Sequence, residues 1–392
     1  MISPFLEEGD TDSMANQAIR QARASFVSSG GANYHDQGSD HSIDDHNRNA
    51  DGKVSGVSRE PPDFRGAVMR RRDLLKSATT LAAGSVATPL LQALSASIPV
   101  IDTHIHLFDP SRRGGVPWPE KTNTVLYHPA LPGRYAGLAQ PHGVVGAIAV
   151  ECSPWLVDNF WLQDIVDRNP IMLGFIGNLE PEAPEFGAAF DRLHRSPFFL
   201  GIRYGNLWDR DLHTSIQKPE FVSGLKLLGQ AGLVLETANP NPVLIAAVLT
   251  VSDRVPDLRI VIDHLPHADP PTDVTARANY ESNLRELSHR PTVFVKGSEI
   301  VRQTGSRVDL DAGTYKTTLD QLWDLFGEDR ILFGSDWPNS DTLAAYDETF
   351  AVAKSYISTR SLSAQEKYFW KNSTQVYKWR SRSSTQAHLQ KY

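Results

Sequence analysis

The 392-residue sequence contains a single cysteine, Cys152, and this scarcity removes two kinds of structure. No intrachain disulfide can form, and no zinc site built from several cysteines is possible. Any bound metal must therefore be held by histidine and carboxylate side chains.

The sequence also lacks an excess of basic residues. Lys and Arg number 39 against 46 Asp and Glu, which gives a net charge of -7 at pH 7. Nucleic-acid-binding domains carry a basic patch or stripe, so we expect no nucleic-acid partner. The hydrophobic content of 40% is sufficient for a packed core.

The first 68 residues lack a sustained apolar period. They are rich in Ser, Asp, Asn, Gly and Gln, a composition that cannot bury enough apolar surface to fold. We interpret residues 1–68 as a disordered extension or an over-extended reading frame, in preference to a metal site formed by their scattered His and Asp residues.

The character of the chain changes at Met69. The run RRDLLK from Arg71 to Lys76 resembles a twin-arginine export signal, with the departure that Arg70 stands where Ser or Thr is usual. Because export signals begin chains, Met69 is a candidate for the true start.

The stretch after this run is only mildly apolar. It contains Gly84 and Pro89 and is too polar for a membrane-spanning helix. We expect residues 69–97 to direct export to the periplasm, with no stable membrane insertion after processing. The protein would remain cytoplasmic if the signal is not used.

From Pro99 onward, short β-branched and aromatic runs alternate with segments of helical spacing. Eight β-then-α units of this length predict an α/β fold, a (β/α)8 TIM barrel over residues 98–392 with extra helices at the C-terminus. An open doubly wound sheet would need a glycine-rich phosphate turn after its first strand, and residues 107–110, LFDP, are not one. A capping box at 363–366 is expected to open the last helix, whose aromatic residues would close the bottom or side of the barrel. The expected strands are Val100–Leu107, Val145–Cys152, Ile171–Leu179, Phe199–Tyr204, Leu233–Ala238, Arg259–Leu265, Thr292–Ser298 and Ile331–Asp336.

Polar residues stand at the ends of these strands, where a TIM barrel carries its catalytic groups. The period-2 alternation of the first strand places His104 and His106 on one side. By the same parity we expect Val261 to face the helices and His264 the barrel axis, and we expect Asp336 to point inward. The other polar residues at strand ends are Glu151, Arg203, Glu236, Asp263, Lys296 and Ser298.

Three motifs in this order resemble the amidohydrolase superfamily, and more narrowly its branch of sugar-acid and dicarboxylate lactonases with related decarboxylases. Dinuclear members of the superfamily bridge two metals with a lysine on strand 4; Arg203 stands there, which argues against a dinuclear site. The motifs are Asp102-x-His104-x-His106, the run DHLP from Asp263 to Pro266 and the run FGSDWP from Phe333 to Pro338, with further matches at GIR (201–203) and VKGS (295–298).

The resemblance implies a hydrolase that opens the lactone of a sugar acid or dicarboxylic acid by attack of water on the ester carbonyl. Asp336 would be the general base. The histidines His104, His106 and His264 would polarise the carbonyl, either as hydrogen-bond donors or through one divalent metal, with zinc favoured, that they and Asp336 hold. Members of this branch are known with and without a metal, so a metal-free mechanism stays open.

A small-molecule substrate is expected to contact four further residues: Arg203, Glu151, Ser298 and Trp337. Arg203 would pair with a carboxylate or hydroxyl group, and Trp337 could pack against a sugar ring. One alternative is a metal-dependent decarboxylase or lyase of an unsaturated or aromatic carboxylic acid, which uses a similar set of His and Asp. Another is a non-catalytic carbohydrate-binding protein, which would be expected to have lost Asp336 or one histidine, and none is lost.

Overall fold

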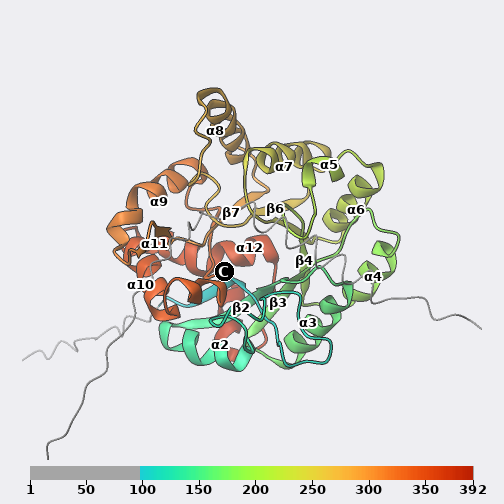
Figure 1. Cartoon of the computed structure of the whole chain (residues 1–392), viewed down its shortest axis with the longest axis horizontal. Helices are drawn as coiled ribbons and strands as arrows, with labels where there is room; N and C mark the ends of the chain where they lie inside the picture. Colours follow the sequence, from blue (N-terminus) through green and yellow to red (C-terminus); the bar gives the residue numbers. More distant parts are fainter. Residues whose placement is uncertain (1–97, 392) are drawn as a thin grey trace, which may run out of the picture. The chain divides into compact units, whose positions relative to one another are not determined.

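Eight parallel strands follow one another in chain order round a barrel, as the sequence predicted (Figure 1). The computed structural model describes residues 98–391. The segments predicted as an extension (1–68) and an export signal (69–97) lie outside these residues. The strands are β1 Val100–Ile105, β2 Val144–Val150, β3 Met172–Gly177, β4 Phe199–Arg203, β5 Val234–Thr237, β6 Arg259–Ile262, β7 Val293–Gly297 and β10 Ile331–Phe333.

Helices surround the barrel and connect its strands (Figure 1). The outer helices are α2 Pro132–Ala139, α3 Leu156–Arg168, α4 Phe186–Leu193, α6 Pro219–Gln230, α7 Pro242–Arg254, α8 Val274–Ser288, α9 Ala312–Phe326 and α10 Tyr346–Ile357. Short elements in the loops are η1 Gln140–His142, α5 Leu212–Ser215, the hairpin of β8 Gln303–Thr304 and β9 Arg307–Val308, and η2 Asn339–Thr342. Within the part of the chain that the structure describes, no helix is both long and apolar enough to cross a membrane.

The barrel is closed where the chain after β10 meets β1. The Asp336 amide donates to the His104 carbonyl at 2.8 Å, and the His106 amide donates to the Trp337 carbonyl at 2.7 Å. Gly334 permits this approach, because a Cβ there would lie 2.7 Å from the Cβ of His104. The closure therefore places Asp336 beside His104 of β1 and His106, which directly follows this strand.

The strands are buried on both faces, as parallel barrel strands must be. One apolar cluster joins their outward side chains to the helices, and a second fills the barrel interior. Val261 belongs to the interior cluster and Ile262 to the outer one, so the expected parity of β6 was wrong. Asp263 takes the next inward position, and His264 reaches the barrel mouth because its left-handed backbone, with φ at +63°, breaks the alternation.

The C-terminal segment closes the amino-terminal end of the barrel. It comprises α11 Leu362–Glu366, η3 Lys367–Lys371, α12 Asn372–Tyr377, α13 Ser384–Ala387 and η4 His388–Lys391. Its first helix begins two residues before the expected capping box, because the Ser361 side chain caps it by accepting from the Ala364 amide at 3.1 Å. Trp370, Tyr377 and Trp379 pack into the interior cluster, which agrees with the predicted role of these aromatics.

Candidate functional site

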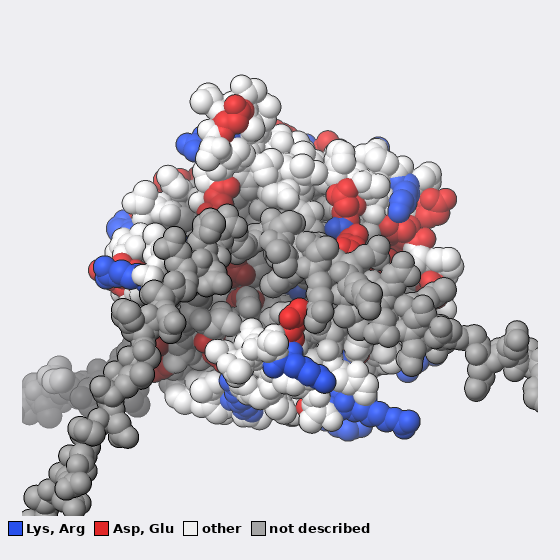
Figure 2. Space-filling model, in the orientation of Figure 1, with Lys and Arg blue, Asp and Glu red and all other residues white. Residues whose placement is uncertain are grey.

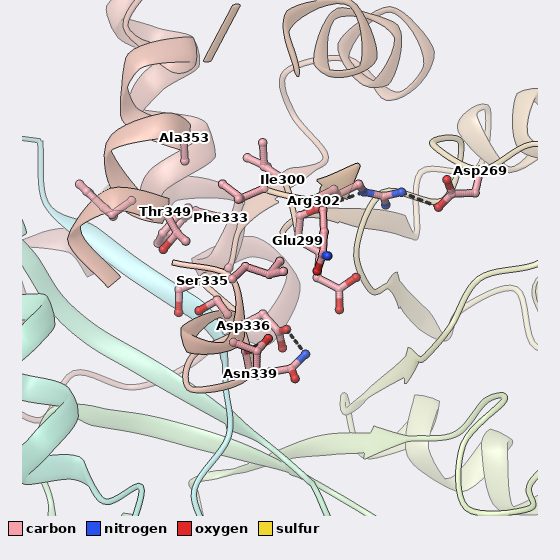
Figure 3. Close-up of a pocket in the computed structure, with 17 residues that line it drawn as sticks. Asp269, Glu299, Ile300, Arg302, Phe333, Ser335, Asp336, Asn339, Thr349 and Ala353 are labelled. Carbon is pink, nitrogen blue, oxygen red and sulfur yellow. Dashed lines mark hydrogen bonds and ion pairs between the residues drawn. The ribbon is translucent and has the colours of Figure 1, made fainter. Parts of the chain in front are cut away.

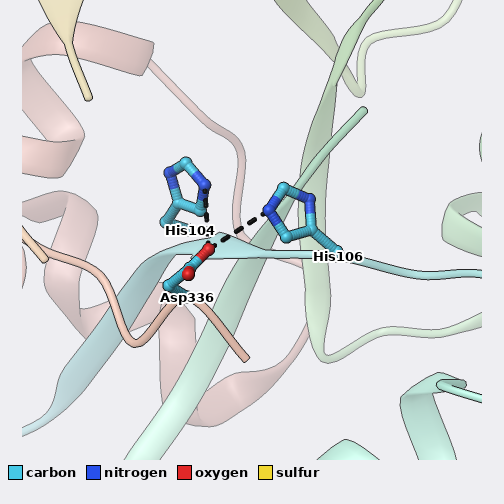
Figure 4. A group of neighbouring side chains, drawn as sticks. All are labelled: His104, His106 and Asp336. Carbon is cyan, nitrogen blue, oxygen red and sulfur yellow. Dashed lines mark ion pairs between the residues drawn. The ribbon is translucent and has the colours of Figure 1, made fainter. Parts of the chain in front are cut away.

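Two histidines and an aspartate meet where the barrel closes (Figure 4). Nε2 of His104 lies 3.5 Å and Nε2 of His106 lies 3.2 Å from the same Asp336 oxygen, Oδ1. All three side chains are buried, yet Asp336 lines a cavity. The period-2 prediction that both histidines leave one side of β1 is therefore confirmed.

Asp102 ties the two halves of this group together. One of its carboxylate oxygens accepts from the His104 amide at 3.2 Å and from the Ser335 amide at 2.9 Å. The other accepts from the Tyr135 hydroxyl at 2.8 Å. A single buried carboxylate thus fixes the backbone beside both His104 and Asp336.

The hydrogen bond at His106 Nδ1 determines what its other nitrogen can do. Nδ1 lies 3.0 Å from the Val150 carbonyl oxygen, which can only accept, so Nδ1 carries a proton. Nε2 of His106 then carries either a second proton or a lone pair directed at the Asp336 carboxylate. A lone pair on Nε2 would be repelled by the lone pairs of Asp336 Oδ1, 3.2 Å away. The contact is therefore favourable when a proton or a metal ion lies between these two atoms.

The surroundings of Asp336 keep its carboxylate ionised. Burial raises its pKa, but the hydrogen bond from His106 and the electrostatic effect of the surrounding imidazole groups outweigh burial, so the pKa lies well below the ordinary value of 3.8. The other carboxylate oxygen, Oδ2, accepts from Asn339 Nδ2 at 2.7 Å.

His264 joins the group from β6 through two neighbours that follow β7. Its Nδ1 lies 3.1 Å from Ser298 Oγ, and its Nε2 lies 3.3 Å from Glu299 Oε1. His264, Glu299 and Asp336 all have left-handed backbones, with φ of +63°, +52° and +58°. Such conformations are unfavourable for residues other than glycine and collect at functional sites.

A fully buried ionic layer supports the site from below. Lys296 Nζ lies 2.7 Å from Glu236 Oε2, 3.1 Å from Asp263 Oδ1 and 3.0 Å from His104 Nδ1. Burial raises the pKa of Asp263, but the charge of Lys296 outweighs that effect and holds the pKa below its usual range. For Glu236, burial prevails over Lys296 and raises the pKa. These charges are buried in the barrel interior, where they are stable only while each is paired with an opposite charge.

The four residues predicted to bind substrate are not gathered round the cavity. Arg203 Nε donates to Glu151 at 2.8 Å, and its Nη1 lies 3.6 Å from Asp263, so its charge is balanced within the barrel. The hydroxyl group of Ser298 contacts Nδ1 of His264. Trp337 is fully buried, packs on Tyr135 and belongs to the outer apolar cluster.

The cavity beside Asp336 has a volume of about 380 Å³. Figure 3 shows Glu299, Arg302, Asp336 and Asn339 around it, and Figure 2 shows acidic side chains in the central hollow of the face it displays. Sequence reasoning missed Glu299 and Asn339, which follow strand ends by a few residues. Their polarity and position were the available signal.

The donor set suits one divalent ion. His104, His106 and Asp336 offer one ligand atom each within 4.8 Å of one another, and His264, Glu299 and Asp336 do the same. His104 Nε2 is buried with no hydrogen-bond partner among the described residues. Imidazole nitrogen and carboxylate oxygen are ligands that zinc prefers, so the residues present fit such an ion.

A (β/α)8 barrel with two histidines on its first strand and an aspartate after its last defines the class of barrel hydrolases to which the motifs pointed. The Amidohydrolase family model (Amidohydro_2) matches residues 101–379, so the chain belongs to this family and is an enzyme of the amidohydrolase superfamily.

The chain is also similar to individual members. It is 29% identical over 242 residues to an L-fucono-1,5-lactonase of Burkholderia ambifaria, covering 61% of this chain and 80% of that protein. It is 25% identical over 286 residues to an L-fucono-1,5-lactonase of Burkholderia multivorans, covering 69% and 92%. A crystal structure of an amidohydrolase from Burkholderia multivorans with bound zinc superposes with a TM-score of 0.62 at 23% identity, covering 72% of this chain and 100% of that one.

Proposed function

We propose that this hydrolase opens a lactone, the cyclic ester of a hydroxy acid, with Asp336 as general base. The observation that carries the proposal is the position of Asp336: an ionised carboxylate on the cavity wall, with Nε2 of His106 at 3.2 Å and Nε2 of His104 at 3.5 Å from one of its oxygens. The lactonase names of the two Burkholderia relatives support it.

In this mechanism each residue has a separate task. Asp336 accepts the proton of the attacking water and later returns it to the departing alkoxide oxygen. Asn339, which donates to Asp336 Oδ2 at 2.7 Å, keeps the carboxylate directed at the cavity. The histidines supply hydrogen-bond donors or metal ligands near the developing oxyanion.

We further propose one zinc ion held by His106 and Asp336, with His104 and His264 as additional candidates. When bound, such an ion would polarise the ester carbonyl and lower the pKa of the attacking water. Asp336, whose own pKa is depressed, is a weak base for ordinary water and would be assisted by that effect.

The decarboxylase alternative needs, besides its metal ion, an unpaired Arg placed to hold the substrate carboxylate. Among the described residues that line the cavity, Arg302 is the single Lys or Arg, and it pairs with Asp269. Arg203 pairs with Glu151 and Asp263. These contacts favour ester hydrolysis over decarboxylation.

A pH-indicator assay over a panel of aldonolactones and dicarboxylate lactones tests the function. Ester opening releases one proton per turnover and no carbon dioxide. We expect proton release with at least one lactone, and release of carbon dioxide from aromatic or unsaturated acids without lactone opening would overturn the proposal.

We also propose export by the RRDLLK run. The full chain should appear in the periplasmic fraction of a bacterium with twin-arginine transport, and replacing Arg71 and Arg72 by Lys should retain it in the cytoplasm. Equal distribution of the two forms would contradict export by this route.

A further inference from the structure

Glu299 presents a carboxylate to the cavity beside the reacting group. Its Oε1 lies 3.3 Å from His264 Nε2, and its side chain is 39% exposed. A carboxylate oxygen of Glu299 lies within 4.8 Å of a ring nitrogen of His264 and of a carboxylate oxygen of Asp336. A substrate group bound at Glu299 would therefore lie close to the ester carbonyl that is attacked by the water activated by Asp336.

The backbone holds this carboxylate in place at a cost. Glu299 has a φ of +52°, a conformation that residues with a side chain rarely adopt. Glu299 lies directly after Ser298, whose hydroxyl group contacts His264, and before the loop that leads to Arg302. Strain retained at a cavity wall indicates a functional constraint on the side chain.

The charge of the cavity lining is predominantly acidic (Figure 3). Among the described residues that line it, the acidic ones are Asp269, Glu299 and Asp336, and the single basic one is Arg302. Arg302 is already paired with Asp269. A second carboxylate on the substrate would thus meet Glu299 with no unpaired Lys or Arg among the described lining residues to balance its charge.

We propose that Glu299 is a specificity-determining residue, which accepts hydrogen bonds from hydroxyl groups of the lactone and disfavours substrates that carry a carboxylate in place of the terminal hydroxymethyl group. The inference rests on the proposed lactonase function and narrows its substrate class to neutral polyhydroxylated lactones. A carboxylate accepts strong hydrogen bonds from hydroxyl groups. It also repels a second carboxylate, and such repulsion is an effective means of discriminating between substrates.

The test compares galactono-1,4-lactone with galactaro-1,4-lactone, which differ in a terminal hydroxymethyl or carboxylate group. For each we measure kcat and KM with the wild type and with Glu299→Gln, which keeps the shape but removes the charge. The ratio of kcat/KM for the neutral over the anionic lactone should fall about tenfold or more, the size expected for one charged hydrogen bond, mainly through KM.

Glu281→Gln is the matched control. It makes the same chemical change on α8, at a side chain that is 48% exposed, pairs with Arg285 and does not line the cavity. The ratio should stay unchanged in this variant. An unchanged ratio in Glu299→Gln, or an equal fall in Glu281→Gln, would overturn the inference.

A binding measurement separates this inference from the proposed reaction. Titration calorimetry with the neutral galactono-lactam, which resists hydrolysis, should show weaker binding to Glu299→Gln than to the wild type. If the wild type hydrolyses no lactone but this difference holds, the reaction fails and the role of Glu299 stands. Equal binding by both proteins would refute the role of Glu299 even if lactones are hydrolysed.

Discussion

Lys296 Nζ lies 3.0 Å from His104 Nδ1, while Asp336 approaches the same ring at Nε2. Between Glu236 and Asp263 the lysine is an ammonium ion, which donates and cannot accept. The neutral His104 ring then carries its proton on Nε2, directed at Asp336 Oδ1, 3.5 Å away. His104 is in this state a hydrogen-bond donor toward the site, and it could ligate a metal only after its proton moved to Nδ1.

The first prediction concerns the ionic layer itself. Lys296→Met should lower the free energy of unfolding by about 3 to 5 kcal/mol, because Glu236 would remain buried without its cation and Asp263 would keep only Arg203 at 3.6 Å. Urea denaturation measures the loss. Lys316→Met, which removes an exposed partner of Asp320 on α9, should cost less than about 0.5 kcal/mol. A decrease in the free energy of unfolding of less than about 1 kcal/mol for Lys296→Met would show that ion pairing does not stabilise this layer.

The second prediction is a pH dependence of stability. Burial and the charge of Lys296 lower the pKa of His104 well below its ordinary 6.5, whereas in the unfolded chain it titrates near 6.5. Below pH 6.5 the unfolded state therefore binds one proton more than the folded state, and stability falls as pH decreases. The slope from this residue is at most about 1.4 kcal/mol per pH unit.

Denaturation between pH 7 and 5 in the presence of a chelator measures that slope. His104→Gln should flatten it by this amount. His289→Gln, at an exposed histidine after α8, should not. Identical slopes in all three proteins would contradict the buried neutral state of His104.

The third prediction concerns zinc. An ion that binds the folded state alone raises stability by about 2.7 kcal/mol when its concentration is a hundred times its dissociation constant. We expect zinc to raise the Tm of the wild type and to lose this effect in His106→Asn, because Val150 already fixes Nε2 of His106 as the free nitrogen. His104→Asn should keep a larger part of the effect, since Lys296 opposes ligation by His104. The reverse order would show that His104 is the stronger ligand.

Much of the architecture and part of the site could be predicted from the sequence. Eight β-branched runs with helical segments between them specify the barrel, because strand and helix periods are local patterns. The pairing of His104 with His106 and the inward direction of Asp336 followed from the same local periodicity, and the structure agrees with both.

The remaining features depend on backbone turns and long-range contacts that local patterns do not show. Left-handed turns are signalled by glycine, and nothing in the sequence marks them at His264 or Glu299. The parity of β6 was misjudged for this reason. Lys296 and Glu236 lie on β7 and β5, which are not neighbours in the barrel, so their contact across the interior becomes visible only once the barrel is closed.

The last prediction concerns Asp336. Asp336→Asn keeps the shape and most hydrogen bonds but removes the proton acceptor, so kcat should fall by roughly 10² or more while the fold survives, the usual size of a general-base contribution. Asp341→Asn serves as the control, because Asp341 lies on η2 nearby but pairs with Arg134. If Asp336 serves only to order the turn after β10, its replacement should instead lower stability by about 1 to 3 kcal/mol and leave turnover of the folded enzyme nearly intact. Tm and kcat measured on one preparation distinguish these results, and an active but less stable Asp336→Asn variant would refute the general-base role.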